Sequence, residues 1–145
     1  MTSLDPQSVA ILNRMLQGEL SAIATYDLAL THLRGEPVTE LGQNRDCHAA
    51  RAEALSGRIR ALGGEPATSS GLWVGFTKLV EQGAALLGSD AVIAVLEQGE
   101  DIGLKQYREH LADLDPESHA LVETDLRPAQ DRSHARLLDL QLARK

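Results

Sequence analysis

The sequence has few aromatic residues: one tryptophan, one phenylalanine and two tyrosines in 145 positions. A β-sheet core is usually rich in aromatic and β-branched side chains, whereas packed helices can be built mainly from leucine and alanine. No stretch alternates apolar and polar residues long enough to predict a strand. The composition therefore favours an all-α fold, and the length predicts a single domain over residues 1–145.

Cysteine, basic patches and long apolar runs are also scarce. The single cysteine, Cys47, excludes an intramolecular disulfide and fits a reducing compartment. The net charge of −7 argues against binding to nucleic acid. The opening residues MTSLDPQSVA lack the features of a secretion signal, and no apolar run approaches the roughly 20 residues that cross a bilayer. We therefore expect a cytoplasmic protein that binds neither a membrane nor nucleic acid.

Capping and helix-breaking residues divide the chain into four long helices. Asp5-Pro6 and Asp115-Pro116 each place an N-cap residue before a proline at the first helical position. Pro128 should kink the last helix, because it removes a backbone donor. Apolar residues recur at helical spacing in four segments, which are 6–33, 39–62, 89–114 and 116 to the C-terminus.

A long connection separates the second and third helices. Glu65 to Gly71 has the composition of a linker, and Leu72–Leu87 has the pattern of a short amphipathic helix. Two helical hairpins joined in this way form an up-down four-helix bundle with a long crossover.

Two similar stretches, QGELSAIATY and QGEDIGLKQY, occur in the first and third helices. Each places a tyrosine seven residues after a glutamate, namely Tyr26 after Glu19 and Tyr107 after Glu100. Both glutamates lie on the apolar stripe of their helix, so we expect them to point into the bundle. The tyrosines are in line with them and could donate hydrogen bonds to carboxylates.

The second and fourth helices also place ionisable residues where we expect the core. Arg45 and His48 interrupt the apolar stripe of the second helix, and Asp131 and His134 share one face of the fourth. Buried charges must be paired or bound to a metal ion. Carboxylates and imidazoles suit iron, manganese or zinc, so Glu19, His48, Glu100, Asp131 and His134 are candidate metal ligands.

These segments resemble the ferritin-like superfamily, particularly bacterioferritin and rubrerythrin. The similar stretches are GELSAIATY, QGEDIGLKQY, HAARAEALSGRIRALGGEP and DRSHARLLDL. The chain also resembles, over nearly its full length, a small bacterial family of uncharacterised ferritin-like four-helix proteins. The superfamily pattern is one glutamate from each of two helices and Glu-x-x-His from each of the others.

The resemblance implies a metal site in the bundle core that binds iron or manganese and oxidises it with oxygen or peroxide. Glu19, His48, Glu100 and His134 match ligand positions, and Asp131 replaces a bridging glutamate. Arg45 stands where the second helix would supply the other bridging glutamate. An arginine offers only donors and repels a cation, so this position departs from the pattern.

Three interpretations follow from this departure. The first is a degenerate two-metal site. The second is a site for one ion at Glu100, Asp131 and His134. The third is a metal-free helical bundle, a stress or interaction protein in which Arg45 forms a buried ion network.

The amphipathic segment Leu72–Leu87 is our candidate for a homodimer contact, because it carries Trp73 and Phe76. We predict that Trp73→Asp keeps the helicity measured by circular dichroism but lowers the mass in solution measured by light scattering. A monomeric wild type, or an oligomer unchanged by the substitution, would contradict the assignment.

Overall fold

The computed structural model describes residues 5–33, 38–69 and 88–144, with the side chains of His32 and Ser89 excepted. Its long helices are α1 (Pro6–His32), α2 (Val38–Ala61) and α4 (Ser89–Glu109). A fourth rod joins α5 (Pro116–Leu121), the π-helical segment η3 (Val122–Leu126) and α6 (Arg127–Ala143). The short 3-10 turn η2 (Leu111–Asp113) precedes this rod. These segments contain no strand, so the all-helical prediction is confirmed.

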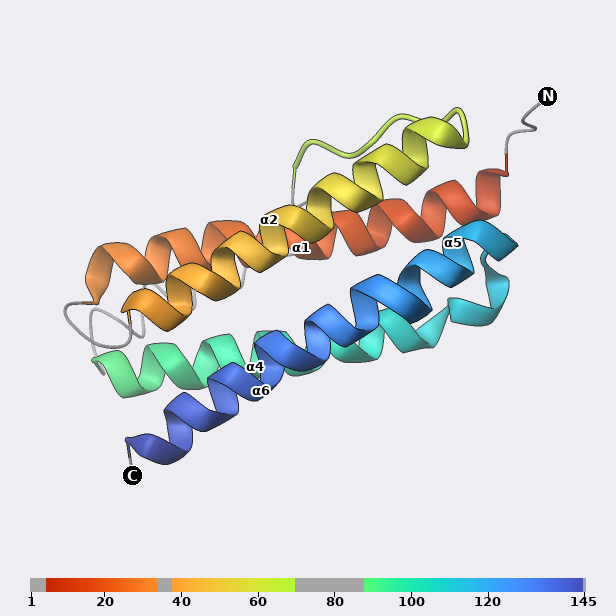
Figure 1. The fold of residues 1–145 in the computed structure, drawn as a ribbon. Helices are drawn as coiled ribbons and strands as arrows, with labels where there is room; N and C mark the ends of the chain where they lie inside the picture. Colours follow the sequence, from red (N-terminus) through yellow and green to blue (C-terminus); the bar gives the residue numbers. More distant parts are fainter. Residues whose placement is uncertain (1–4, 34–37, 70–87, 145) are drawn as a thin grey trace.

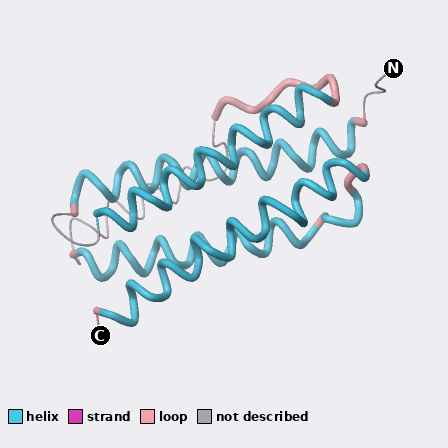
Figure 2. The backbone as a smooth tube through the Cα atoms, in the orientation of Figure 1, coloured by secondary structure: helices cyan, strands magenta, loops and turns pink. Residues whose placement is uncertain are grey.

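The helices are arranged as two antiparallel hairpins (Figures 1 and 2). One hairpin contains α1 and α2, and the other contains α4 and the fourth rod. The α1 and α4 helices run in opposite directions, which decides the geometry of the site described below. The predicted helix and dimer contact at Leu72–Leu87 lie within residues 70–87, outside the described residues. None of the helices in the described segments is long and apolar enough to cross a membrane.

Both predicted N-caps are present. The side chain of Asp5 accepts a hydrogen bond from the backbone N–H of Ser8, and that of Asp115 accepts one from Ser118. In each case a proline occupies the first turn, where its missing N–H costs no hydrogen bond. Local sequence therefore fixes where α1 and the fourth rod begin.

The fourth rod departs from α-helical geometry directly before Pro128. The N–H of Arg127 bonds to the carbonyl of Val122, five residues back, within the π-helical segment η3. Proline cannot donate the next hydrogen bond, so the ladder is interrupted at the same place. The kink expected at Pro128 stays a prediction, but the irregularity of the helix lies beside this residue.

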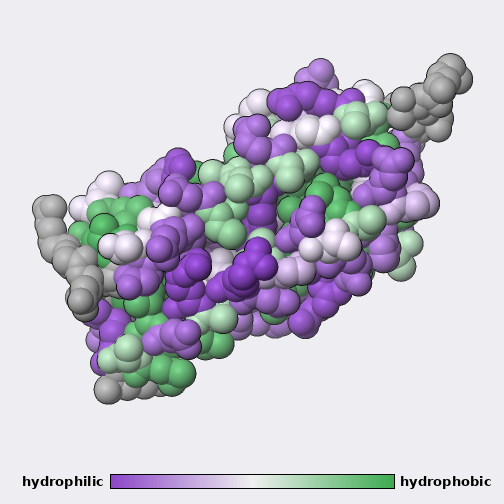
Figure 3. All heavy atoms as spheres, viewed as in Figure 1, coloured by the Kyte–Doolittle hydropathy of each residue, from purple (hydrophilic) through white to green (hydrophobic). Residues whose placement is uncertain are grey.

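Two apolar clusters fill the two ends of the bundle. The first packs residues of α1 and α2 against the C-terminal end of α4 and the beginning of the fourth rod; it includes Ile11, Leu12, Leu16, Leu55, Ile59, Tyr107 and Leu126. The second contains Tyr26, Leu33, Leu41, Val92, Ile93, Leu96 and Leu137. Hydrophilic residues dominate the face of the molecule drawn in Figure 3. Between the two clusters lies a buried polar layer, and this layer contains the site.

Arg58 of α2 links the two hairpins at one end of the bundle. It donates hydrogen bonds to the side chains of Ser118, Glu117 and Asp115, at 2.9, 2.9 and 3.0 Å. We predict that Arg58→Met lowers the free energy of unfolding by about 1–2 kcal/mol, because these bonds are lost and the Asp115 cap loses its cation. Chemical denaturation measures the change. The exposed neighbour Arg60 is the matched control, and an equal effect of Arg60→Met would refute the role of Arg58.

Candidate functional site

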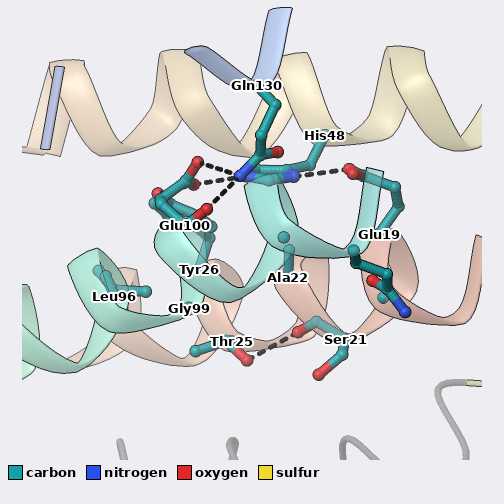
Figure 4. Close-up of a pocket in the computed structure, with 13 residues that line it drawn as sticks. Glu19, Ser21, Ala22, Thr25, Tyr26, His48, Leu96, Gly99, Glu100 and Gln130 are labelled. Atoms are coloured by element: carbon teal, nitrogen blue, oxygen red, sulfur yellow. Dashed lines mark hydrogen bonds and ion pairs between the residues drawn. The ribbon is translucent and has the colours of Figure 1, made fainter. Parts of the chain in front are cut away.

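Four ionised side chains meet in the buried layer, and we call them the quartet: Glu19, His48, Arg51 and Glu100. They come from α1, α2, α2 and α4 and are between 2 and 4% exposed. Two carry a negative charge, and two can carry a positive charge. Figure 4 shows His48 lying between the carboxylates of Glu19 and Glu100.

The position of His48 determines its protonation state. Its Nδ1 lies 2.6 Å from Glu19 Oε2, and its Nε2 lies 2.6 Å from Glu100 Oε2. A carboxylate only accepts, so both ring nitrogens must carry a proton to make these bonds. The ring is therefore an imidazolium ion, and Arg51, whose Nε donates to Glu19 Oε2 at 3.2 Å, adds the second positive charge. The buried quartet is electrically neutral.

Each glutamate is also held by a pair of residues from the neighbouring helix of its own hairpin. Glu19 accepts from His48 and Arg51 of α2, which are three residues apart. Glu100 accepts from Gln130 and Ser133 of α6, also three residues apart, at 3.1 and 2.5 Å. Residues at this spacing share one helical face. The two hairpins therefore build the site in the same way with different side chains.

The two tyrosines bond to the glutamate of the other hairpin. Tyr26 of α1 donates to Glu100 Oε2 at 2.6 Å, and Tyr107 of α4 donates to Glu19 Oε1 at 2.7 Å. Seven residues of α-helix rise about 10.5 Å. Because α1 and α4 are antiparallel, equal spacing brings each tyrosine opposite the other helix's glutamate. The repeated Glu-x6-Tyr spacing is thus explained by crossed hydrogen bonds between the hairpins.

The quartet shifts the pKa values of its members. Burial alone would lower the pKa of His48, but Glu19 and Glu100 outweigh it and raise the pKa to about 9. Burial would raise the pKa of Glu19, but His48 and Arg51 lower it to about 2. The pKa of Glu100 is lowered against burial mainly by His48. At neutral pH all four groups are therefore charged.

The inward placement predicted for Arg45 is wrong. Its side chain is 35% exposed, and its Nε donates to Asp27 of α1 at 2.9 Å on the outside of the bundle. The inward face of α2 instead contains Asn44, His48 and Arg51. The sequence signal was available, because Leu41, Asn44, His48, Arg51 and Leu55 follow one another at steps of three or four residues.

The inward placement predicted for Asp131 and His134 is also wrong. Asp131 is exposed, and His134 is half-buried with its Nε2 3.1 Å from Glu97 of α4. The buried face of the fourth rod runs through Ser118, Val122, Leu126, Ala129, Ser133 and Leu137, at steps of three or four. Following this stripe would have identified Ser133; choosing residues for their ligand chemistry selected an exposed residue, Asp131, and a half-buried one, His134.

The quartet does not fit the two-metal site that the resemblance implied. Glu19, His48 and Glu100 do meet, but the ring nitrogens of His48 point to different carboxylates and cannot both bind one ion. The guanidinium of Arg51 lies against the same ring. In the described parts of the chain, no three His, Cys, Asp or Glu side chains are placed to share a metal ion. The carboxylates are instead satisfied by protein donors.

The opposite pKa shifts of His48 and Glu19 predict a stability maximum in mildly acidic solution. Stability from His48 is complete below its ordinary pKa of 6.5 and is lost as the pH rises through about 9, by on the order of 3 kcal/mol. Stability from Glu19 is present above 4.5 and is lost as the pH falls towards 2.

The measurement is the free energy of unfolding in urea between pH 3 and pH 10. The substitution His48→Gln, which removes the titrating ring, should abolish the decline between pH 6.5 and pH 9 but not the decline in acid. If the alkaline decline persists in this variant, another group causes it.

Comparison with known proteins identifies a family whose function is unknown. Residues 7–113 match the family described as a domain of unknown function (DUF2383). No curated protein and no solved structure matches the chain. The matched region includes α1, α2 and α4 and therefore all four residues of the quartet. The chain belongs to the DUF2383 family.

Proposed function

We propose that this chain is a ferritin-like helical bundle in which the quartet replaces the two-metal centre, and that it acts as a structural or interaction protein. The observation that carries the proposal is the charge balance of the buried layer. Two carboxylates face one imidazolium and one guanidinium, all of them buried. The layer is therefore neutral without an added cation.

The residues beside the glutamates support this proposal. In the superfamily pattern, Glu-x-x-His on two helices completes the metal site. The pairs that reach Glu19 and Glu100 here are His48 with Arg51 and Gln130 with Ser133. Arg51 cannot give up its proton, and Gln130 brings no charge. These pairs supply hydrogen-bond donors to the glutamates where the metal proteins supply ligands.

Binding of iron or manganese is the competing function. It would need the imidazolium of His48 to lose one of its two ring protons and Arg51 to leave the layer. A site that also used Asp131 and His134 would need both to turn inward, Asp131 from an exposed position and His134 from its contact with Glu97. The changes at His48 and Arg51 break hydrogen bonds and ion pairs in a buried environment, where removing one partner of a charge pair costs about 3–5 kcal/mol.

Replacing Arg51 with glutamate tests the proposal. The substitution leaves three carboxylates facing one imidazolium, so we expect the apo variant to lose roughly 3–5 kcal/mol of stability. Ferrous iron or manganese should restore part of this loss, because a ligand that binds only the folded state stabilises it. Thermal melting and metal analysis of the purified proteins measure both effects. The wild type should retain far less than one metal ion per chain.

The substitution Arg45→Glu is the matched control, because it makes the same charge change on the exposed face of α2. It should leave metal uptake unchanged, and it should change the free energy of unfolding by less than about 1 kcal/mol. Near-stoichiometric iron, manganese or zinc in the wild type would overturn the proposal and favour a metal site at Glu19, His48 and Glu100.

A further inference from the structure

A small cavity lies between α1 and α4, next to the quartet (Figure 4). Its volume is about 40 Å³, which is room for roughly three groups of the size of water. Its wall includes Ala22, Leu96 and Gly99, and its floor includes Glu19, His48 and Glu100. Ala22 and Gly99 are only half-buried, so the cavity extends to the edge of the bundle in the described part of the chain.

The donors on the wall of this cavity are used within the protein. Tyr26 donates to Glu100, Thr25 donates to the carbonyl of Ser21 at 2.7 Å, and both ring nitrogens of His48 contact carboxylates. The amide nitrogen of Gln106 donates to the carbonyl of Arg14 at 3.2 Å. The acceptors that remain at the cavity are side-chain amide oxygens and Oε1 of Glu19, because the other carboxylate oxygens of Glu19 and Glu100 each accept two hydrogen bonds already.

One of these acceptors is buried without a partner. Gln130 lines the cavity and is 1% exposed, and its Oε1 has no hydrogen-bond partner among the described residues. Its Nε2 donates to the carbonyl and the carboxylate of Glu100, at 2.7 and 3.1 Å. Turning the amide over would place two oxygens against each other, so the acceptor role of Oε1 is fixed.

The glycine at position 103 leaves room for this amide. A Cβ there would lie 2.8 Å from Gln130 Nε2 and 3.5 Å from Oε1, which is too close for the present position of the amide nitrogen. The amide of Gln130 thus lies close to the backbone of Gly103, in space that a side chain at this position would occupy. Leaving a buried acceptor such as Oε1 without a donor is unfavourable, and a ligand that donates to it recovers part of the lost free energy.

We propose that the cavity binds the ammonium group of a small primary amine. Its N–H donors match the unpartnered Oε1 of Gln130 and Oε1 of Glu19, which accepts one hydrogen bond from the described residues, and a short alkyl group fits against Ala22 and Leu96. The volume limits the bound group to about three heavy atoms, which ethylammonium has. The net charge of −7 favours the approach of a cation. This inference goes beyond the proposed function and does not require it.

The test compares two organic cations on the full-length wild type at equal ionic strength. Ethylammonium should raise the melting temperature by about 4 °C at a tenfold excess over its dissociation constant. Tetramethylammonium carries the same charge but has no N–H donor and is too large, so it should cause no rise. Equal effects of the two cations, or no effect of ethylammonium, would overturn the proposal.

Two variants that replace an alanine of α1 with leucine test whether ethylammonium binds in the cavity. Ala22→Leu fills the cavity without replacing any residue of the quartet and should abolish the shift caused by ethylammonium. Ala24→Leu adds the same volume at an exposed position and should leave the shift unchanged. An undiminished shift in a folded Ala22→Leu protein would place binding elsewhere and refute the site. If Ala22→Leu does not fold, the comparison of the two cations on the wild type still decides.

Discussion

The structure depends on how two buried carboxylates are neutralised. Glu19 and Glu100 lie in the middle of the bundle, between two apolar clusters, where an unpaired charge would be too costly to keep. Donors from α2 and α4 surround Glu19, and donors from α1, α2 and α6 surround Glu100. Because these donors come from both hairpins, the hydrogen bonds that satisfy the carboxylates also fix how the hairpins pack.

The two hairpins are similar in form but unequal in charge. In the buried layer the first contributes Glu19, His48 and Arg51, which sum to one positive charge, and the second contributes Glu100, which is negative. Only the pairing of unlike hairpins gives a neutral layer. A hairpin packed against its own kind would bury two like charges. The polar layer therefore adds specificity to a core that leucine and alanine alone would define less sharply.

The sequence predicted the four long helices and three of the four residues of the quartet, Glu19, His48 and Glu100. Capping residues and apolar periodicity located the helices, and the repeated Glu-x6-Tyr stretches identified Glu19 and Glu100 as inward. Arg45, Asp131 and His134 were misplaced because their chemical type was given more weight than the apolar stripe of their helices. Arg51, Gln130 and Ser133 lie on those stripes, but arginine, glutamine and serine are common on surfaces. Their role depends on side chains of other helices, which local periodicity does not contain.

A bundle with two inward glutamates needs positive charge or hydrogen-bond donors at its centre, and metal ions and side chains are alternative ways to supply them. Which of the two supplies them depends on two pairs of residues, one pair on α2 and one on α6, and the members of each pair are three residues apart in the sequence. Here they are His48 and Arg51, and Gln130 and Ser133, which donate to carboxylates or balance their charge. A shared helical architecture is compatible with both alternatives. The chemistry of these four positions, rather than the fold, is therefore the ground on which a function can be assigned.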